Sequence, residues 1–154
     1  MKTVAQHDRE KILSIMDRIA FFDQFSTFEK NDLVEFHTHF FVFDAGEYLI
    51  REKETETFFF ILLAGSVNVT VGTPEKSIDR LEPGEIFGEM SFLAGTPRTT
   101  NVAAEEMVIA IRVDRDMMDR LPVALREKIK DRIIHKLVLR LDRMNRRFVE
   151  NHGE

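Results

Sequence analysis

The chain has 154 residues, of which 44% are hydrophobic and 32% charged, and its 22 basic and 27 acidic side chains give a formal net charge of −5. This length suits one ordinary domain, and the acidic balance argues against a general nucleic-acid binder, which needs a basic surface. The absence of cysteine excludes a disulfide scaffold, a cysteine-ligated zinc site and a cysteine nucleophile. No apolar run reaches the ~18–20 residues of a membrane span, and the first residues lack a signal-peptide core, so we expect a soluble cytoplasmic protein.

Two helices are predicted at the start of the chain. Apolar residues recur at helical spacing within residues 4–20, and Ser26-Thr27-Phe28-Glu29 is a capping box that opens a second helix through Phe36. Three phenylalanines, at positions 21, 22 and 25, lie between these helices. We expect them to pin the pair to the next element because phenylalanine adds bulk without a polar group.

From residue 37 the pattern becomes strand-like. The segments are rich in aromatic, aliphatic and β-branched residues, and Gly and Pro turns separate many of them. The predicted strands are 37–43, 47–51, 57–63, 67–71, 77–81, 101–104 and 108–113. Seven short strands separated by such turns indicate a sandwich or a barrel.

Two further helices are predicted at the end of the chain. Asp114 caps a short helix that ends at Leu121-Pro122, and a long helix follows over about residues 124–148. Its apolar residues recur mostly at every fourth position, which indicates one buried face rather than a coiled-coil heptad. They are Leu125, Ile129, Ile133, Leu137, Leu141, Met144 and Phe148.

Charge is divided along the chain. Residues 1–122 hold 13 basic and 22 acidic side chains, giving −9, whereas residues 123–154 hold 9 and 5, giving +4. A solvated basic helix face accounts for this division more simply than a nucleic-acid or membrane contact does. The side chains available for such a contact are Arg140, Arg143, Arg146 and Arg147.

Residues 87–102, FGEMSFLAGTPRTTNV, interrupt the strands with a helix-like turn over residues 89–93 and a loop that we expect at the surface. Gly88 permits close backbone approach, and helix N-terminal N–H groups and the planar fork of Arg98 suit a phosphate. Ionised Glu89 accepts hydrogen bonds only, which suits a sugar hydroxyl. This combination suggests a ligand that has both a phosphate and a ribose. Judged by spacing alone, a structural ion pair between Glu89 and Arg98 is the simpler alternative.

The same segment resembles the phosphate-binding cassette of the cyclic-nucleotide-binding domain family, which includes protein-kinase regulatory subunits, cyclic-nucleotide-gated channels and the catabolite activator protein. The resemblance is ungapped over residues 87–102, and the order of elements extends it to nearly the whole chain. It implies a mainly β fold with flanking helices and one domain over 1–154. The expected parts are N-terminal helices (1–36), an eight-stranded jelly-roll barrel (37–113) that carries the cassette, and a short helix plus a lid helix (114–148).

The resemblance also implies roles within the cassette. Glu89 would accept the ribose 2′-OH beside the backbone of Gly88, and Arg98 would pair with the cyclic phosphate. Backbone N–H groups of Ser91 and Thr99 would complete the phosphate cradle, and Thr99 could reach the edge of a purine. The full set of expected ligand-binding residues is Gly88, Glu89, Met90, Ser91, Arg98, Thr99 and Thr100.

Two positions depart from the family pattern. The turn that usually reads Glu-Gly-Asp is Glu52-Lys53-Glu54 here, so lysine stands where glycine at positive φ is usual. The residue after Thr99 is usually a small alanine and is Thr100 here. We expect either a strained or a remodelled turn at Lys53, and an extra hydroxyl near the phosphate.

Metal binding and catalysis are not expected. His37 and His39 would share a face of the first predicted strand, as does the His-X-His pair that begins the metal site of cupin enzymes, which use a similar barrel. A metal site needs a third ligand, and the turn at Pro83-Gly84 supplies no histidine after it. The sequence contains no Gly-X-Ser-X-Gly elbow, P-loop or His-Glu-X-X-His motif, and Ser91 has no obvious base.

We therefore expect a non-catalytic, stand-alone sensor that needs no cofactor, binds cAMP in preference to cGMP, and signals through its C-terminal helix or a separate partner protein. Ligand capture would draw that helix over the base by a population shift. The candidate base-capping residues are Arg132, His135 and Arg140. The alternative is a non-binding jelly-roll scaffold or dimerisation module with a degenerate site.

The C-terminal part of the sequence indicates which macromolecular partners to expect. About six residues follow the long helix, too few for a helix-turn-helix module, so we expect no DNA-binding domain. The long helix is also a candidate homodimer interface.

Overall fold

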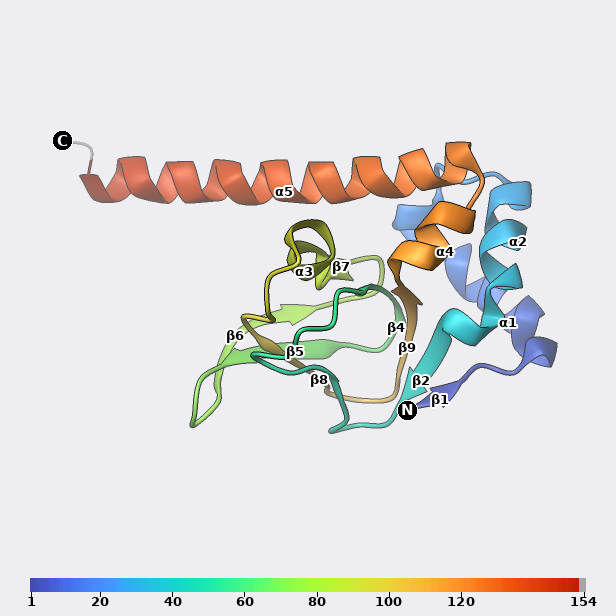
Figure 1. The fold of residues 1–154 in the computed structure, drawn as a ribbon, viewed down its shortest axis with the longest axis horizontal. Coiled ribbons are helices and arrows are strands. Elements are labelled where there is room, and N and C mark those ends of the chain that lie inside the picture. The colour runs from blue at the N-terminus through green and yellow to red at the C-terminus, as the bar shows by residue number, and fades with distance from the viewer. Residues whose placement is uncertain (153–154) are drawn as a thin grey trace. The chain divides into compact units, whose positions relative to one another are not determined.

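The computed structural model describes residues 1–152. These residues fall into two units that meet at Leu121 and Pro122, and each unit is described by itself. The strands all lie in the first unit, where they form two antiparallel sheets (Figure 1). The five-stranded sheet has the order β1 (Lys2–Thr3), β2 (Phe40–Phe43), β9 (Val108–Val113), β4 (Phe59–Ala64) and β7 (Ile86–Phe87). The four-stranded sheet has the order β3 (Tyr48–Ile50), β8 (Asn101–Ala104), β5 (Val67–Val71) and β6 (Lys76–Leu81).

The hydrophobic core draws on both sheets. Alternate residues of β2, β4 and β9 point to one face, as the two-residue period of a strand requires, and join residues of β3, β5 and β8 in one buried cluster. Phe60 exemplifies the packing, because its ring contacts Phe43 edge to face and stacks on Phe87. This mainly β architecture with flanking helices confirms the predicted fold class.

The described residues contain nine strands, whereas the sequence analysis predicted seven. The two additional strands, β1 and β7, are two residues long, and such short strands show no alternation in the sequence. β1 pairs with β2, and the Val4 N–H continues this pairing by donating to the Phe40 carbonyl at 2.8 Å. The predicted helix over 4–20 therefore begins later: a 3-10 turn, η1 (Gln6–Asp8), leads into α1 (Arg9–Met16).

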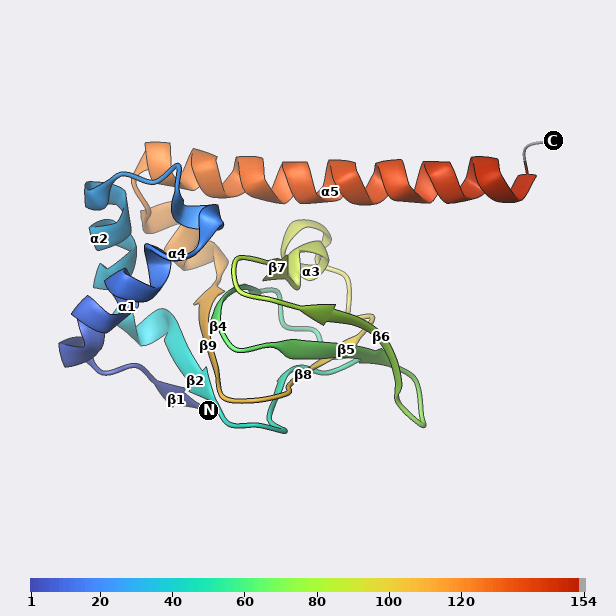
Figure 2. The same cartoon turned by 180° about the vertical axis from the view of Figure 1, so that it is seen from behind.

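The second predicted helix is confirmed as α2 (Thr27–Glu35). Ser26 caps it, because the Ser26 hydroxyl accepts from the Glu29 N–H at 3.1 Å and the Glu29 carboxylate accepts from the Ser26 N–H at 2.8 Å. A 3-10 turn, η2 (Ala20–Phe22), joins the helices. Phe21, Phe22 and Phe25 are buried in edge-to-face contact with one another. Figures 1 and 2 show α1, α2 and the short α4 (Arg115–Arg120) gathered at one end of the sheets.

The first predicted strand was wrong over residues 37–39. These residues form a 3-10 turn, η3 (His37–His39), and β2 begins only at Phe40. The chain leaves α2 through Phe36 at φ −82° and ψ 42°, which is not an extended conformation, so it must turn before it can enter the sheet. His37 and His39 therefore do not share a strand face, and His39 Nδ1 instead bonds to the Arg112 carbonyl at 2.9 Å.

The second unit consists of one long helix, α5 (Val123–His152), which is longer than predicted. Leu125, Ile129 and Ile133 are buried. The prediction of a single buried face is wrong for the second half, because Leu141, Met144 and Phe148 are 58%, 57% and 65% exposed. No helix in residues 1–152 is long and apolar enough to cross a membrane.

Candidate functional site

The segment over residues 87–102 folds as predicted, as a short helix between two strands. β7 ends at Phe87, α3 spans Glu89–Ala94, and β8 begins at Asn101. Gly88 and Gly95 flank α3 at φ 84° and φ 67°, in the left-handed region that glycine adopts most readily. At Gly88 space is equally restrictive, because an added Cβ would lie 2.9 Å from both Arg98 Nη1 and Ile50 Cδ1.

Arg98 is buried beneath this segment and is only 5% exposed. Its Nη1 donates to the Gly88 carbonyl at 2.8 Å, and its Nη2 donates to the Phe58 carbonyl at 2.5 Å. Its Nε is buried and has no hydrogen-bond partner. The expectation of a surface-placed loop is thus wrong at this residue, because the two carbonyls and the Phe58 ring, whose centroid lies 5.2 Å from Arg98 Cζ, hold the side chain inside.

The charge of Arg98 is poorly compensated. Burial lowers the pKa of its guanidinium, against the opposing effect of Glu56, Glu54 and Glu89, yet an arginine stays protonated in proteins. No ion pair joins Arg98 to a carboxylate within the described part of the chain, so the direct Glu89–Arg98 pair is not formed. A buried cation whose hydrogen bonds go only to neutral carbonyls lacks the anion that normally accompanies it.

Some of the other predicted ligand-binding residues have buried side chains and some have exposed ones. Glu89 and Ser91 are each 3% exposed, and Glu89 is close enough to Arg98 to raise its pKa. The Met90 and Thr99 side chains are exposed, and that of Thr100 is half-buried. The structure therefore brings the Gly88 backbone, Glu89 and Arg98 together and leaves the Met90 and Thr99 side chains at the surface.

A turn between β3 and β4 supports Arg98 from the other side. The Arg98 N–H donates to the Glu54 carbonyl and the Lys53 N–H donates to the Arg98 carbonyl, both at 2.8 Å. Lys53 has φ 70°, which makes it the one residue other than glycine with positive φ among those described. Of the two expected outcomes at Lys53, the structure therefore shows the strained turn rather than the remodelled one.

Sequence reasoning missed Phe58 and Asn101. Phe58 contributes its carbonyl and its ring to Arg98, and the Asn101 side chain accepts a hydrogen bond from the Glu52 N–H at 2.9 Å. A carbonyl acceptor carries no sequence signal because every residue has one. The polar Asn101 at the start of a buried strand was the available signal for the second contact.

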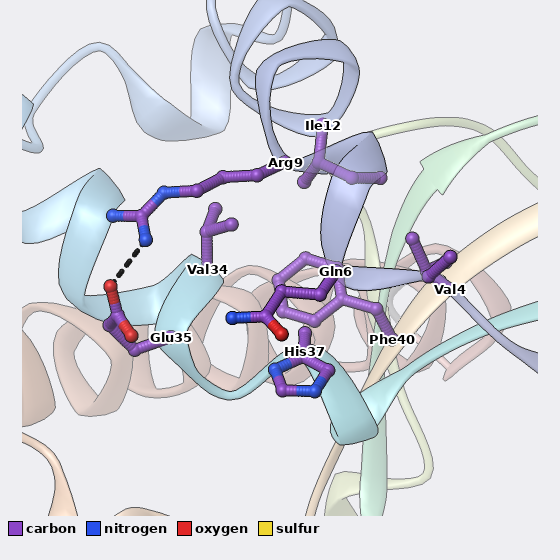
Figure 3. Close-up of a pocket in the computed structure, with 9 residues that line it drawn as sticks. Val4, Gln6, Arg9, Ile12, Val34, Glu35, His37 and Phe40 are labelled. Atoms are coloured by element: carbon purple, nitrogen blue, oxygen red, sulfur yellow. Dashed lines mark hydrogen bonds and ion pairs between the residues drawn. The ribbon is translucent and has the colours of Figure 1, made fainter.

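The pocket drawn in Figure 3 lies elsewhere, between the N-terminal segment, α1 and α2. Val4, Ile12, Val34 and Phe40 give it apolar walls, and Arg9 pairs across it with Glu35. It includes no residue of the 87–102 segment. Within residues 1–152 no three His, Cys, Asp or Glu side chains are placed to hold a metal ion.

The sequence of this chain matches one known family. Residues 40–122, more than half of the chain, match the sequence model described as "Cyclic nucleotide-binding domain". The chain belongs to the cyclic nucleotide-binding domain family. The resemblance seen in the sequence is thereby confirmed.

Two curated relatives and one solved structure illustrate the family. Human cGMP-dependent protein kinase 2 is 37% identical over 83 residues, which is 51% of this chain and 11% of the kinase. The cAMP-dependent protein kinase regulatory subunit of Emericella nidulans is 32% identical over 79 residues, 51% of this chain and 19% of the relative. The matched region is therefore a small part of each relative.

The crystal structure of a cyclic nucleotide-binding domain from Methylobacillus flagellatus superposes with a TM-score of 0.70 at 24% identity, covering 99% of this chain and 89% of that chain. This similarity supports the fold. It does not identify the ligand of this chain.

Proposed function

We propose that this chain is a non-catalytic regulatory module that binds a cyclic nucleotide, cAMP in preference to cGMP, in the segment over residues 87–102. The observation that carries the proposal is Arg98, a buried guanidinium that bonds only to carbonyls and retains an unpartnered Nε. A cyclic phosphate is a monoanion with two exocyclic oxygens, which match the donor geometry of a guanidinium.

Phosphate binding needs little rearrangement of Arg98. The Gly88 and Phe58 carbonyls fix the plane of the guanidinium before the ligand arrives, so its orientation costs little further entropy. The phosphate would then supply the missing negative charge, with backbone N–H groups of Ser91 and Thr99 completing its cradle.

Glu89 is assigned to the ribose. Its buried carboxylate can accept a hydrogen bond from the 2′-OH, whereas it would repel a phosphate. Gly88, Met90 and Thr100 complete the proposed ligand-binding residues. A 2′-deoxy cyclic nucleotide should therefore bind markedly less tightly than its parent, because a buried acceptor loses its donor.

The proposal extends to the cofactor, the cellular location and the partners of the chain. The module would use no cofactor, act in the cytoplasm as one domain over 1–154, and pass its response through α5 or a separate partner protein by a population shift. A homodimer formed through α5 is part of this proposal.

Isothermal titration with cAMP, cGMP and a cyclic dinucleotide tests the ligand assignment, using the unaltered chain, Arg98→Ala and Arg80→Ala. Arg80 is a matched control because it is an exposed arginine with carboxylate partners, Glu82 and Glu105. Arg98→Ala should weaken cAMP binding roughly thirtyfold or more, and Arg80→Ala should not. Equal affinity in all three proteins would reject the site.

A non-binding scaffold is the second candidate, and strained Lys53 is the observation that favours it, since the turn it occupies is bonded to Arg98. Failure of the unaltered chain to bind any of the three nucleotides would select this candidate.

A further inference from the structure

Arg112 lies on β9 and is half-buried, on the sheet face that carries the core cluster. Val108 and Ala110 of the same strand belong to the buried core cluster, and the two-residue period of a strand places Arg112 on their side. In register, Arg112 pairs with Phe60 of β4, another member of that cluster. Because the side chain is half-buried, its charge is only partly solvated, and a nearby anion would stabilise it.

Two phenylalanine rings hold the Arg112 guanidinium. Its Cζ lies 4.4 Å from the ring centroid of Phe41 and 5.0 Å from that of Phe58. The same Phe58 ring lies 5.2 Å from Arg98 Cζ. Phe41, Arg112, Phe58 and Arg98 thus form an alternating row of rings and cations, which we call the arginine–phenylalanine row.

The row leaves Arg112 without a polar partner. Among residues 1–152 its guanidinium makes no hydrogen bond and no ion pair; the His39 ring bonds to its backbone carbonyl, not to its side chain. Aromatic faces attract cations, but they do not cancel the repulsion between two guanidinium groups that share one ring. An anion bound next to this ring would compensate both charges at once.

We infer that Arg112 is a second cationic binding residue for the phosphate of the ligand, held in place by Phe41 and Phe58. This inference rests on the proposed function, because it places the phosphate beside Arg98. It assigns ligand recognition to β9, outside the segment over residues 87–102 that carries the other proposed contacts.

Three variants test the charge of Arg112 by measuring the dissociation constant of cAMP at low and high salt. Arg112→Gln removes the charge, Arg112→Lys keeps it, and Arg51→Gln is a matched control because Arg51 also lies on an aromatic ring, 3.9 Å from the centroid of Tyr48, but is exposed. Arg112→Gln should weaken binding roughly 5- to 20-fold, with a larger loss at low salt, because salt screens charge interactions. Arg112→Lys should retain most of the affinity, and Arg51→Gln should match the unaltered chain.

Two results would overturn the inference: Arg112→Gln binding as tightly as the control, or Arg112→Lys binding as weakly as Arg112→Gln, which would mean that packing rather than charge matters. Thermal melting of each variant without ligand verifies that it is folded. If Arg112→Gln does not fold, the dissociation constant of Arg112→Lys tests the inference instead. Including Arg98→Ala separates the two proposals. If Arg98→Ala weakens binding and Arg112→Gln does not, only the role of Arg112 fails; if neither does, the proposed site fails with it.

Discussion

Gly88 and Arg98 are sterically dependent on each other. Gly88→Ala would place a Cβ 2.9 Å from Arg98 Nη1 at a φ of 84°, whereas Gly95→Ala introduces a Cβ with nothing within 4 Å at a φ of 67°. In both variants a Cβ at positive φ destabilises the folded state by about 1–2 kcal/mol, but only Gly88→Ala also displaces the Arg98 side chain. We expect Gly88→Ala to be less stable than Gly95→Ala in urea unfolding and to bind cAMP more weakly. Equal binding by the two variants would show that Arg98 does not need its present position.

Tyr48 offers a direct titration because it is the single tyrosine of the chain. Its hydroxyl donates to Glu75 at 2.6 Å, and this hydrogen bond, followed by burial, raises the pKa of Tyr48 above its ordinary value. A raised folded-state pKa means that this contribution to stability is present below the unfolded pKa of about 10 and is lost as the pH rises through the folded pKa. Ultraviolet titration of tyrosinate should give a midpoint above 10 that falls in Glu75→Gln; an identical midpoint in both proteins would contradict the assigned cause.

Chemistry alone drew attention to the central site residues but left a structural ion pair as the simpler interpretation, and only the family resemblance favoured a ligand site; the environment of these residues could not be predicted. A glycine, a carboxylate and an arginine at this spacing indicated a phosphate and ribose site, and the structure brings Gly88, Glu89 and Arg98 together. The burial of Arg98 and its hydrogen bond to the Phe58 carbonyl could not be predicted, because this bond joins residues 40 positions apart in the sequence and is a tertiary property. The role inferred for Arg112 likewise depends on strand register rather than on any motif.

At the scale of elements, turn residues and helix capping were the informative signals. β5, β8 and β9 have the predicted ends because turn or polar residues delimit each of them. β1 and β7 were missed because two residues cannot alternate, and residues 37–39 were assigned to a strand because aromatic and β-branched composition does not reveal the exit angle of α2. Local sequence patterns therefore predict the longer helices and strands, whereas the shortest elements depend on the path of the chain in three dimensions.

The turn at Lys53 yields a prediction at the element scale. Lys53 sits at φ 70°, where a Cβ costs about 1–2 kcal/mol and glycine costs nothing. Lys53→Gly should therefore stabilise the protein by about 0.5–1 kcal/mol, after subtracting the greater freedom of glycine in the unfolded chain. Lys53→Ala keeps the Cβ and removes the charge, so it serves as the control and should not gain stability. Urea unfolding of the three proteins measures the difference, and a gain in Lys53→Ala as large as that in Lys53→Gly would attribute the effect to charge.

At the scale of the whole molecule, we predict a homodimer formed through α5. The sequence pattern predicted no coiled-coil heptad over the whole helix, but exposed or half-buried apolar residues beyond Ile133 recur at alternating spacings of three and four, the pattern of a coiled-coil seam. They are Ile134, Leu137, Leu141, Met144 and Phe148. In a parallel pair this seam would be flanked by Arg140 and Arg147 on one side and by Val138 and Asn145 on the other. In this arrangement the arginines of one helix face no arginines of the other, so charge repulsion does not oppose a homodimer.

A single substitution on each side of α5 tests that assembly. Leu141 lies on the seam and Leu139 lies two positions away, outside it, while both are exposed leucines of the same helix. Leu141→Glu would bury a carboxylate against its symmetry mate and should convert a dimer to a monomer in sedimentation equilibrium. Leu139→Glu adds the same charge without touching the seam, so it should leave the mass unchanged. If the unaltered chain stayed monomeric at concentrations up to about 100 μM, any dimer would have a Kd above that value, and the homodimer would be rejected. If Leu139→Glu dissociated the dimer as fully as Leu141→Glu, the seam would be assigned to the wrong face of the helix.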